Sequence, residues 1–251
     1  MKILLLAGHG YNTSGNFDPG CVGFGYQEAD LTRVVVNHLK VGLSKVEGVT
    51  VDVFEEVLGK SMNPYSYVAN KGFNFSPYDY ILEVHFNSMQ NRDLTGNGKT
   101  TGAEILVHTN EKGISVEEAI LKHVAKLGYK NRGVVRRDNL LVMNHAKKKY
   151  GKSYALIECC FLADKDDVDL IMQPDGIKKY ANAVVDGIIE GFGLKYKEVS
   201  TPKELTTVND IVWELANRGI ISDSALWLKK LEEDSNSYWL ARKTVKYLMN
   251  N

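Results

Sequence analysis

The strongest constraint on the fold of this chain is the alternation of short apolar runs with longer amphipathic runs over about its first 195 residues. KILLLAG, at residues 2–8, has the continuous apolar character of a strand buried on both faces, and residues 29–46 have the apolar spacing of a helix. Strands that alternate with helices predict an α/β fold, with a mostly parallel, twisted sheet and helices on both faces.

The other expected elements continue this alternation, and no internal repeat is visible. Further strands are expected at residues 49–56, 78–88, 101–109 and 153–161, and further helices at residues 115–127 and 175–194. The last of these helices closes the α/β part of the chain.

The C-terminal segment differs from the rest of the chain in composition and in its apolar pattern. EVSTPKEL combines a proline with a serine and threonine cluster and predicts a linker, placed at residues 197–204 between a domain of residues 1–196 and a module of residues 205–251. Three amphipathic stretches in the module predict a small three-helix bundle. They carry the chain's three tryptophans, Trp213, Trp227 and Trp239. A bundle this small needs apolar side chains for its core, so we expect at least two of these indoles to pack inside it.

Composition excludes several classes of function. Lys and Arg total 31 and Asp and Glu total 31, so no large uniform field favours nucleic acid or an anionic membrane. No apolar stretch approaches the ~20 residues that span a bilayer. MKILLLAGHG lacks the features of a secretory signal peptide, so we expect synthesis in the cytosol and export by another route. Cys21, Cys159 and Cys160 predict no disulfide framework and fit a reducing compartment.

Four side chains that can bind a metal or a proton are expected at one edge of the sheet. His9, His85 and Glu158 each end an expected strand, and the carboxyl ends of parallel strands gather functional groups. Glu28 opens the first helix a short loop after His9, so its side chain can return to the same edge.

Two imidazoles and one carboxylate with an open fourth position form a known ligand set for catalytic zinc. His9, Glu28 and His85 fit as ligands, and Glu158 fits as a general base and acid. The glycines on either side of His9 would let the backbone turn and leave room for a metal. The spacing equally fits a plainer interpretation, in which His9 is a hydrogen-bonded histidine and Glu28 complements the helix dipole. A buried, unpaired Glu158 would cost several kcal/mol, which favours a partner or a catalytic role.

The remaining histidines are weaker candidates. His38 and His123 lie in expected helices and should be at the surface or in an interface. His108 and His145 could lie near the rim of the site, and His145, in the loop-like MNHAKKK, is a candidate for contacting substrate.

Four motifs together resemble the zinc-dependent N-acetylmuramoyl-L-alanine amidases, which are peptidoglycan hydrolases of the phage endolysin and autolysin type. The motifs are LLAGHG…DPGCVGFGYQEADLT, EVHFNS, NRGVVRRDNLLVMN and ALIECCFLAD, in the family's order over roughly residues 1–194. The resemblance implies one Zn²⁺ per chain on His9, Glu28 and His85, with Glu158 as the catalytic carboxylate. It also implies cleavage of the amide bond between N-acetylmuramic acid and L-alanine. The chain departs from the family pattern in a longer loop before DPG and in the two cysteines after Glu158.

The resemblance also implies partners and a place of action. Peptidoglycan would be the substrate, and the C-terminal module would bind a cell-wall polymer or pair two chains into a homodimer, with Tyr238 and the indoles available to stack on sugars. A phage endolysin would accumulate in the host cytoplasm and reach the wall after a holin or lysis opens the membrane, and a bacterial autolysin released by lysis also fits. Two alternatives stay open: a catalytically inactive wall-binding protein, and a hydrolase with Cys21, Cys159 or Cys160 as its nucleophile.

Overall fold

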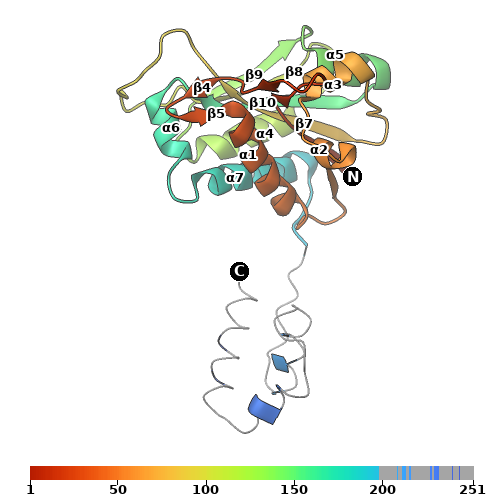
Figure 1. Ribbon diagram of the computed structural model, residues 1–251, viewed down its shortest axis with the longest axis vertical. Helices are drawn as coiled ribbons and strands as arrows, with labels where there is room; N and C mark the ends of the chain where they lie inside the picture. The colour runs from red at the N-terminus through yellow and green to blue at the C-terminus, as the bar shows by residue number, and fades with distance from the viewer. Residues whose placement is uncertain are drawn as a thin grey trace. The chain divides into compact units, whose positions relative to one another are not determined.

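A six-stranded sheet organises the computed structural model of the chain (Figure 1). In order across the sheet, its strands are β6 (Thr50–Val53), β1 (Lys2–Ala7), β7 (Tyr80–Asn87), β10 (Ser153–Phe161), β8 (Ala103–His108) and β9 (Asn131–Arg137). The first four are parallel, whereas β8 runs antiparallel to β10 and pairs with β9 in parallel at the outer edge. The mostly parallel sheet expected from the sequence is therefore confirmed, with one reversal.

The structure describes residues 1–197 and, beyond them, residues 208, 211, 212, 215, 227, 229–231, 239 and 243. Residues 1–197 form one unit and residues 198–251 a second. The expected three-helix module lies mostly outside the described residues, as does Trp213. Within it, Ile211, Val212 and Leu215 are buried, whereas Trp239 is 58% exposed.

Helices cover both faces of the sheet, because successive residues of the central strands point to opposite sides. Ile3 and Leu5 of β1 enter one core, and Leu4 and Leu6 enter the other. The first core is covered by α1 (Glu28–Leu43), α4 (Ser115–Ala125) and α7 (Gly176–Phe192). The second is covered by α2 (Phe54–Leu58), α3 (Pro64–Lys71), α5 (Leu141–Asn144) and the π-helix η1 (His145–Lys149). A further helix, α6 (Lys165–Ile171), follows β10. Among the described residues, no helix is long and apolar enough to cross a membrane.

The three long helices expected from the sequence are α1, α4 and α7, each within a few residues of the expected bounds. The expected strand at residues 49–56 is wrong in its second half, since β6 ends at Val53 and α2 begins at Phe54. This helix has only five residues and stops at Gly59, which has a φ of 66°. So short a helix shows too little of the 3.6-residue period to be distinguished from a strand.

Two small hairpins cover the carboxyl edge of the sheet between β1 and α1. They are β2 (Gly10–Tyr11) with β3 (Phe17–Asp18), and β4 (Val22–Gly23) with β5 (Tyr26–Gln27). The amides of Glu28 and Ala29 donate to the carbonyls of Cys21 and Pro19, which ties the loop to the start of α1. This path returns the chain to His9 and places Asp18 and Glu28 beside it.

Candidate metal centre

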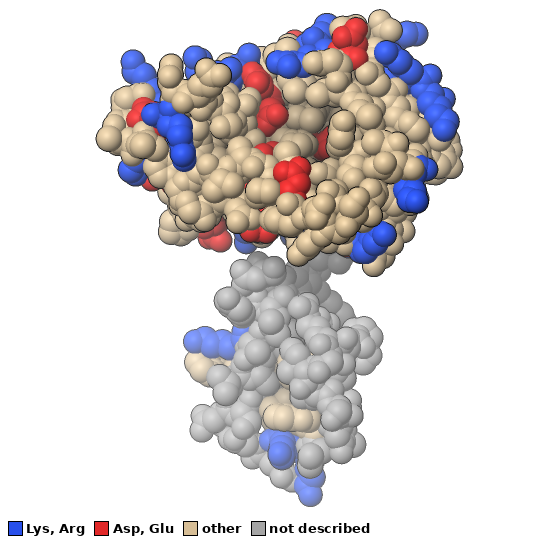
Figure 2. Space-filling view, turned by 45° about the horizontal axis from the view of Figure 1, so that its top comes forward, with Lys and Arg blue, Asp and Glu red and all other residues tan. Residues whose placement is uncertain are grey.

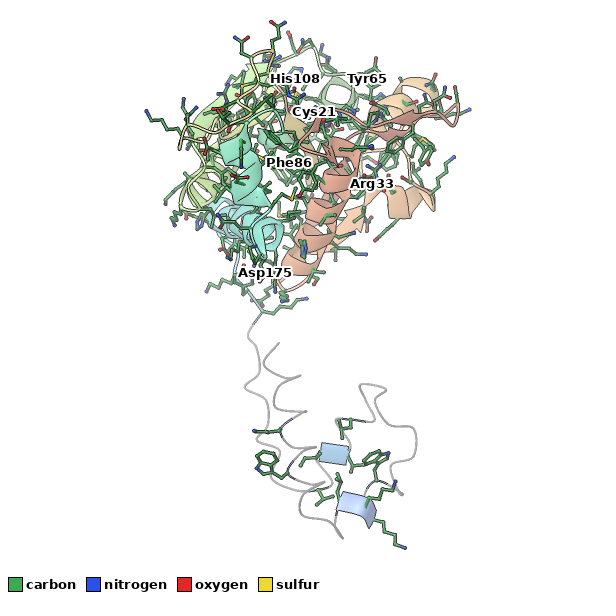
Figure 3. All side chains as sticks on the ribbon, turned by 60° about the vertical axis from the view of Figure 1, so that its left-hand side comes forward. Cys21, Arg33, Tyr65, Phe86, His108 and Asp175 are labelled. Carbon is green, nitrogen blue, oxygen red and sulfur yellow. The ribbon has the colours of Figure 1, made fainter. Side chains whose placement is uncertain are left out.

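His9 is held in an unusual backbone conformation just after β1. Its φ is 61°, and that of Gly10 is 97°. A positive φ is uncommon in a residue with a side chain and persists where the surroundings enforce it. Arg33, which lies on α1 (Figure 3), supplies this support. Its guanidinium donates to the carbonyls of Gly8 and His9 at 3.3 and 3.1 Å and pairs with Glu55 at 2.5 Å.

Glycines keep the space around the candidate ligands free. A Cβ on Gly8 would lie 2.4 Å from Cε1 of His85, and one on Gly20 would lie 2.5 Å from Oε2 of Glu28. Gly10 supplies the turn after His9, whereas Gly8 keeps the way clear for the second imidazole. Any side chain at Gly8 or Gly20 would displace a member of the cluster.

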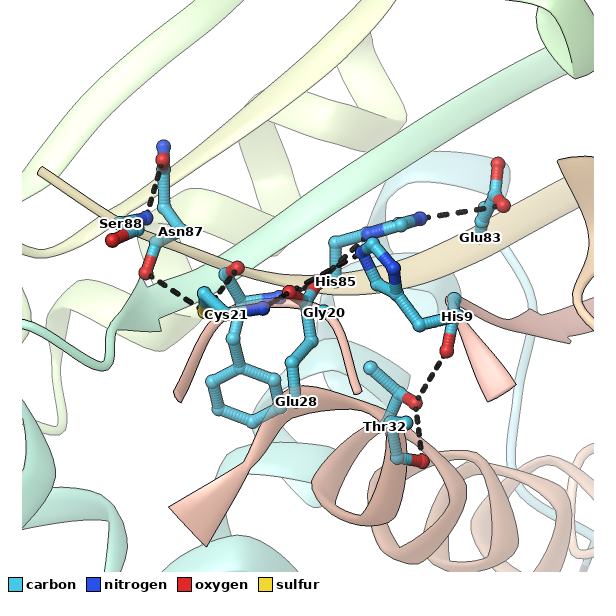
Figure 4. A network of polar contacts seen from close by, with 12 residues as sticks. His9, Gly20, Cys21, Glu28, Thr32, Glu83, His85, Asn87 and Ser88 are labelled. Carbon is cyan, nitrogen blue, oxygen red and sulfur yellow. Dashed lines mark hydrogen bonds and ion pairs between the residues drawn. The ribbon is translucent and has the colours of Figure 1, made fainter. Parts of the chain in front are cut away.

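Glu28, the first residue of α1, joins the two imidazoles (Figure 4). Its Oε1 lies 2.8 Å from Nδ1 of His85, and its Oε2 lies 3.3 Å from Nε2 of His9. The carboxylate also accepts hydrogen bonds from the amides of Phe86 and Cys21, at 2.9 and 2.8 Å. One donor atom from each of the three side chains lies within 4.8 Å of the others. Tetrahedral zinc ligands at 2.0–2.1 Å are roughly 3.3 Å apart, so these residues fit one such ion.

The other ring nitrogen of each histidine faces a second carboxylate. Nδ1 of His9 lies 2.8 Å from Oδ2 of Asp18, and Nε2 of His85 lies 3.3 Å from Oε1 of Glu83. A histidine that binds a metal through one nitrogen typically donates the other N–H to such a group. Sequence reasoning missed both carboxylates. The available signal for Glu83 was a charged residue inside an apolar strand, two residues before His85 and on the same face.

Charges in the cluster favour a cation. Burial raises the pKa of Glu28, but hydrogen bonds to His85 and His9 outweigh this and hold the pKa well below its usual range. Burial lowers the pKa of both imidazoles, but contact with Glu28 reverses this and leaves the pKa of His9 above its usual value and that of His85 well above it. A metal ion would therefore meet an ionised carboxylate and replace ring protons. The His9 and His85 side chains keep 27% and 17% exposure, so the cluster is accessible.

Glu158 lies beside His85 on the neighbouring strand, in register with it. Its Oε2 is buried and has no hydrogen-bond partner among the described residues. Burial raises the pKa of Glu158 to about 7; the coulombic effect of His85 opposes this rise, and those of Glu28 and Glu104 add to it. A carboxyl group with a pKa near neutrality can both accept and donate a proton at physiological pH.

A cavity of about 290 Å³ opens beside the two imidazoles. Its lining combines four apolar side chains with polar and aromatic ones: Leu140, Leu141, Val142 and Leu156, then Asp18, Asn63, Tyr65 and Glu83. Figure 2 shows acidic side chains gathered around a hollow on one face of the first unit. The candidate centre is thus reached from an apolar cavity with carboxylates nearby.

The structure does not bring the other two candidate histidines to the site. His108 ends β8, and the reversal of this strand places it one residue beyond the Val107–Ala155 pair, towards the amino end of β10. It is 1% exposed and its Nε2 contacts Oδ1 of Asn144 at 3.0 Å. His145 packs on the ring of Phe75, and its Nε2 contacts the carbonyl of Phe73 at 3.1 Å. Both side chains therefore make their polar contacts outside the His9–Glu28–His85 cluster.

The three thiols are poorly suited to nucleophilic catalysis. Cys159 and Cys160 are fully buried, and burial raises the pKa of each well above its usual value. Burial, reinforced by the nearby Glu28, likewise raises the pKa of Cys21, whose thiol donates to the carbonyl of Phe86 at 3.2 Å. The thiolate is the reactive form, so these surroundings disfavour a cysteine nucleophile. His38 and His123 lie on the helices α1 and α4, as expected, and both are half-buried.

Fold and cluster together define an α/β protein with a candidate metal centre at the carboxyl edge of its parallel strands. Residues 3–190 match the family model described as N-acetylmuramoyl-L-alanine amidase (Amidase_3). The chain belongs to this amidase family, which confirms the resemblance found in its sequence motifs.

Individual relatives agree with this assignment. The chain is 28% identical over 182 residues to the probable autolysin PH of Staphylococcus aureus, over 68% of this chain and 35% of the autolysin. It is 24% identical over 209 residues to the endolysin of Bacillus phage SPP1, over 80% of this chain and 70% of the endolysin. The chain thus spans about a third of the length of the autolysin that it matches.

Solved structures share the fold. The catalytic domain of the CD27L endolysin, which targets Clostridia difficile, is 25% identical with a TM-score of 0.57, over 76% of this chain and 97% of that one. Cwp6 from Clostridium difficile is 23% identical with a TM-score of 0.60, over 76% of this chain and 29% of that one.

Proposed function

We propose that the chain is a zinc-dependent N-acetylmuramoyl-L-alanine amidase, which hydrolyses the amide bond between the lactyl group of N-acetylmuramic acid and L-alanine. Membership of the amidase family supports the reaction class. The observation that carries the proposal is the cluster of His9, Glu28 and His85, in which each imidazole has a further carboxylate at its outer nitrogen. This donor set suits zinc better than calcium or magnesium, which prefer oxygen ligands.

His9, His85 and the Glu28 carboxylate would hold one zinc ion. The ring nitrogens that face Glu28, Nε2 of His9 and Nδ1 of His85, would be the histidine ligand atoms. Zinc in such a site supplies a Lewis acid for the scissile carbonyl and makes water a nucleophile at neutral pH. Asp18 and Glu83 lie at the ring nitrogens of His9 and His85 that face away from Glu28. The partial exposure of the imidazoles leaves the fourth side of the cluster open to substrate.

Glu158 is the proposed proton carrier. Its carboxylate accepts a proton from the attacking water as the new C–O bond forms at the carbonyl carbon. The same proton then passes to the alanine nitrogen as the C–N bond breaks, so the products are a free lactyl carboxylic acid and an amine. A buried oxygen without a partner in the described structure suits a group that exchanges protons with substrate.

Metal removal and one substitution test the proposal. The full chain is stripped with a chelator and titrated with Zn²⁺, and release of stem-peptide amines from a soluble muropeptide is followed. Wild type should bind one equivalent of zinc and recover activity with it. His85→Ala should lose both, while His38→Ala, which removes a half-buried histidine of α1 outside the cluster, should keep both. Stoichiometric zinc and normal turnover in His85→Ala would contradict the assignment. Wall binding without amine release by the zinc-loaded wild type would instead support an inactive wall-binding protein.

We further propose that the protein acts as an endolysin, released from the host cytoplasm through a membrane lesion to reach the wall. The similarity to the SPP1 endolysin supports this role. Residues 205–251 would bind a wall polymer or pair two chains, and would do no chemistry.

A further inference from the structure

Glu83 is a buried acidic residue that the proposed reaction does not itself use. It lies in the middle of β7, is 4% exposed, and shares a sheet face with His85. A buried carboxylate costs several kcal/mol unless hydrogen bonds or charges compensate for lost water. Its neighbours therefore explain why an apolar strand accommodates it.

Each oxygen of Glu83 has one partner. Oε2 accepts a hydrogen bond from the hydroxyl of Tyr154, which is 1% exposed on the adjacent strand β10. Oε1 lies 3.3 Å from Nε2 of His85 (Figure 4). The carboxylate thus stands between a fixed hydroxyl donor and the ring nitrogen of His85 that points away from Glu28.

This arrangement favours the tautomer of His85 that carries its ring proton on Nε2. When Nδ1 gives its lone pair to a metal, the remaining ring proton is on Nε2, the nitrogen that faces Glu83. A carboxylate there accepts that proton's hydrogen bond, fixes the ring plane, and makes Nδ1 a stronger donor.

We propose that Glu83, held by Tyr154, is a positioning residue that presents Nδ1 of His85 to the zinc ion. The proposal rests on the zinc site of the proposed function. A parallel set serves His9, where Asn63 donates to Asp18 at 3.2 Å and Asp18 contacts the ring. The Asp18 side chain is 45% exposed against 6% for Glu83, so water screens Asp18 more strongly. Glu83 should therefore have the larger effect on the metal.

The chain contains a matched control on the opposite sheet face. Tyr80 donates to Glu117 at 2.9 Å, and both residues are buried. This pair has the same chemistry as Tyr154 and Glu83, but its carboxylate contacts no histidine. Substitutions in it measure the cost of disturbing a buried tyrosine–glutamate pair in general.

The experiment measures zinc affinity of the full chain by competition with a chromophoric chelator. Glu83→Gln and Tyr154→Phe should each weaken zinc binding about 10- to 100-fold. Glu117→Gln and Tyr80→Phe should stay within about twofold of wild type. Because Tyr154 acts through Glu83, the double variant should lose little more than Glu83→Gln alone. The Nε2–H proton signal of His85 in zinc-loaded wild type should be strongly downfield in the NMR spectrum and should shift in Glu83→Gln.

Several outcomes would overturn the proposal. Zinc affinity within about twofold of wild type in both test variants would remove the positioning role, as would equal losses in the control pair. Complete loss of zinc in Glu83→Gln would make Glu83 a ligand instead. If circular dichroism shows that Glu83→Gln does not fold, Tyr154→Phe, which removes one buried oxygen, decides the question. Failure of wild type to bind zinc would overturn the proposed function together with this inference.

Discussion

Glu28 is the residue on which the candidate centre most depends, because its two oxygens contact both imidazoles and two backbone amides. Sequence reasoning could place it near His9 and His85, since strand ends and the first turn of the next helix meet at one edge of a parallel sheet. It did not identify Asp18 or Glu83. Their contacts depend on the path of the loop after β1 and on side-chain conformations that no periodic pattern reports.

Substitution of Glu158 tests its role as proton carrier. Glu158→Gln, nearly isosteric, should keep stoichiometric zinc and lose amidase turnover by about 10²-fold or more, because the amide cannot accept a proton from water. Zinc content by elemental analysis and kcat on soluble muropeptide measure the two effects separately. Glu190→Gln, an exposed carboxylate on α7, is the control and should change neither. Loss of zinc from Glu158→Gln would show that Glu158 is a ligand.

Among the elements, length decides which helices can be predicted from the sequence, and apolar character decides which strands can. The long helices α1, α4 and α7 span several turns, so their apolar stripes are unambiguous. The short helices have too few residues for a clear period, and β9 (NRGVVRR) carries three arginines in place of an apolar or alternating run. The direction of β8 is invisible to periodicity as well, because an alternating or apolar run reads the same in either direction. That reversal moved His108 away from the site.

Asp167, near the start of α6, should make the free energy of unfolding depend on pH. Asp167 accepts hydrogen bonds from the amides of Phe161 and Gly102, and burial raises its pKa to about 6. The folded protein therefore holds this proton more tightly than the unfolded chain, where an aspartate has a pKa of about 3.9. The stabilisation is complete below about pH 4 and is lost as pH rises through about 6, at most about 3 kcal/mol.

Urea unfolding at pH 4 and pH 7 tests whether this group makes the folded protein less stable as pH rises. The fall in unfolding free energy between these values should be smaller in Asp167→Asn than in wild type, because the variant lacks the titrating group. Titrations elsewhere are common to both proteins and cancel in the comparison. Asp169→Asn, with a side chain 60% exposed on the same helix, should behave as wild type. An equal or steeper fall in Asp167→Asn would contradict the prediction.

At the scale of the whole molecule, the C-terminal residues of the first unit are hydrogen-bonded to earlier parts of the same unit. Tyr196 forms a bridge with Val46, its hydroxyl donates to Asp186 at 2.6 Å, and the amide of Lys197 donates to the carbonyl of Lys45 at 2.7 Å. The domain of residues 1–196 and the linker of residues 197–204 stay predictions. What residues 205–251 contribute stays a prediction.

A chain that ends after Lys197 tests that contribution. It should keep zinc and amidase turnover on soluble muropeptide, because the candidate centre and both cores lie within residues 1–197. If the second unit binds the wall, the shortened chain should sediment less with intact walls than the full chain. If the second unit pairs two chains, analytical ultracentrifugation should show a dimer for the full chain and a monomer for the shortened one. Unchanged wall affinity and unchanged oligomeric state would remove the proposed role of the second unit.

The strand order also governs how the chain folds as it is made. β10 is the last of the six strands to leave the ribosome, yet it lies between β7 and β8 in the middle of the sheet. Until it arrives, the nascent chain has two separate half-sheets, each with an open strand edge that can pair wrongly or aggregate. Insertion of β10 closes both edges at once. The same insertion brings Glu158 beside His85. The proposed proton carrier therefore reaches the site at the same step that removes the two open edges.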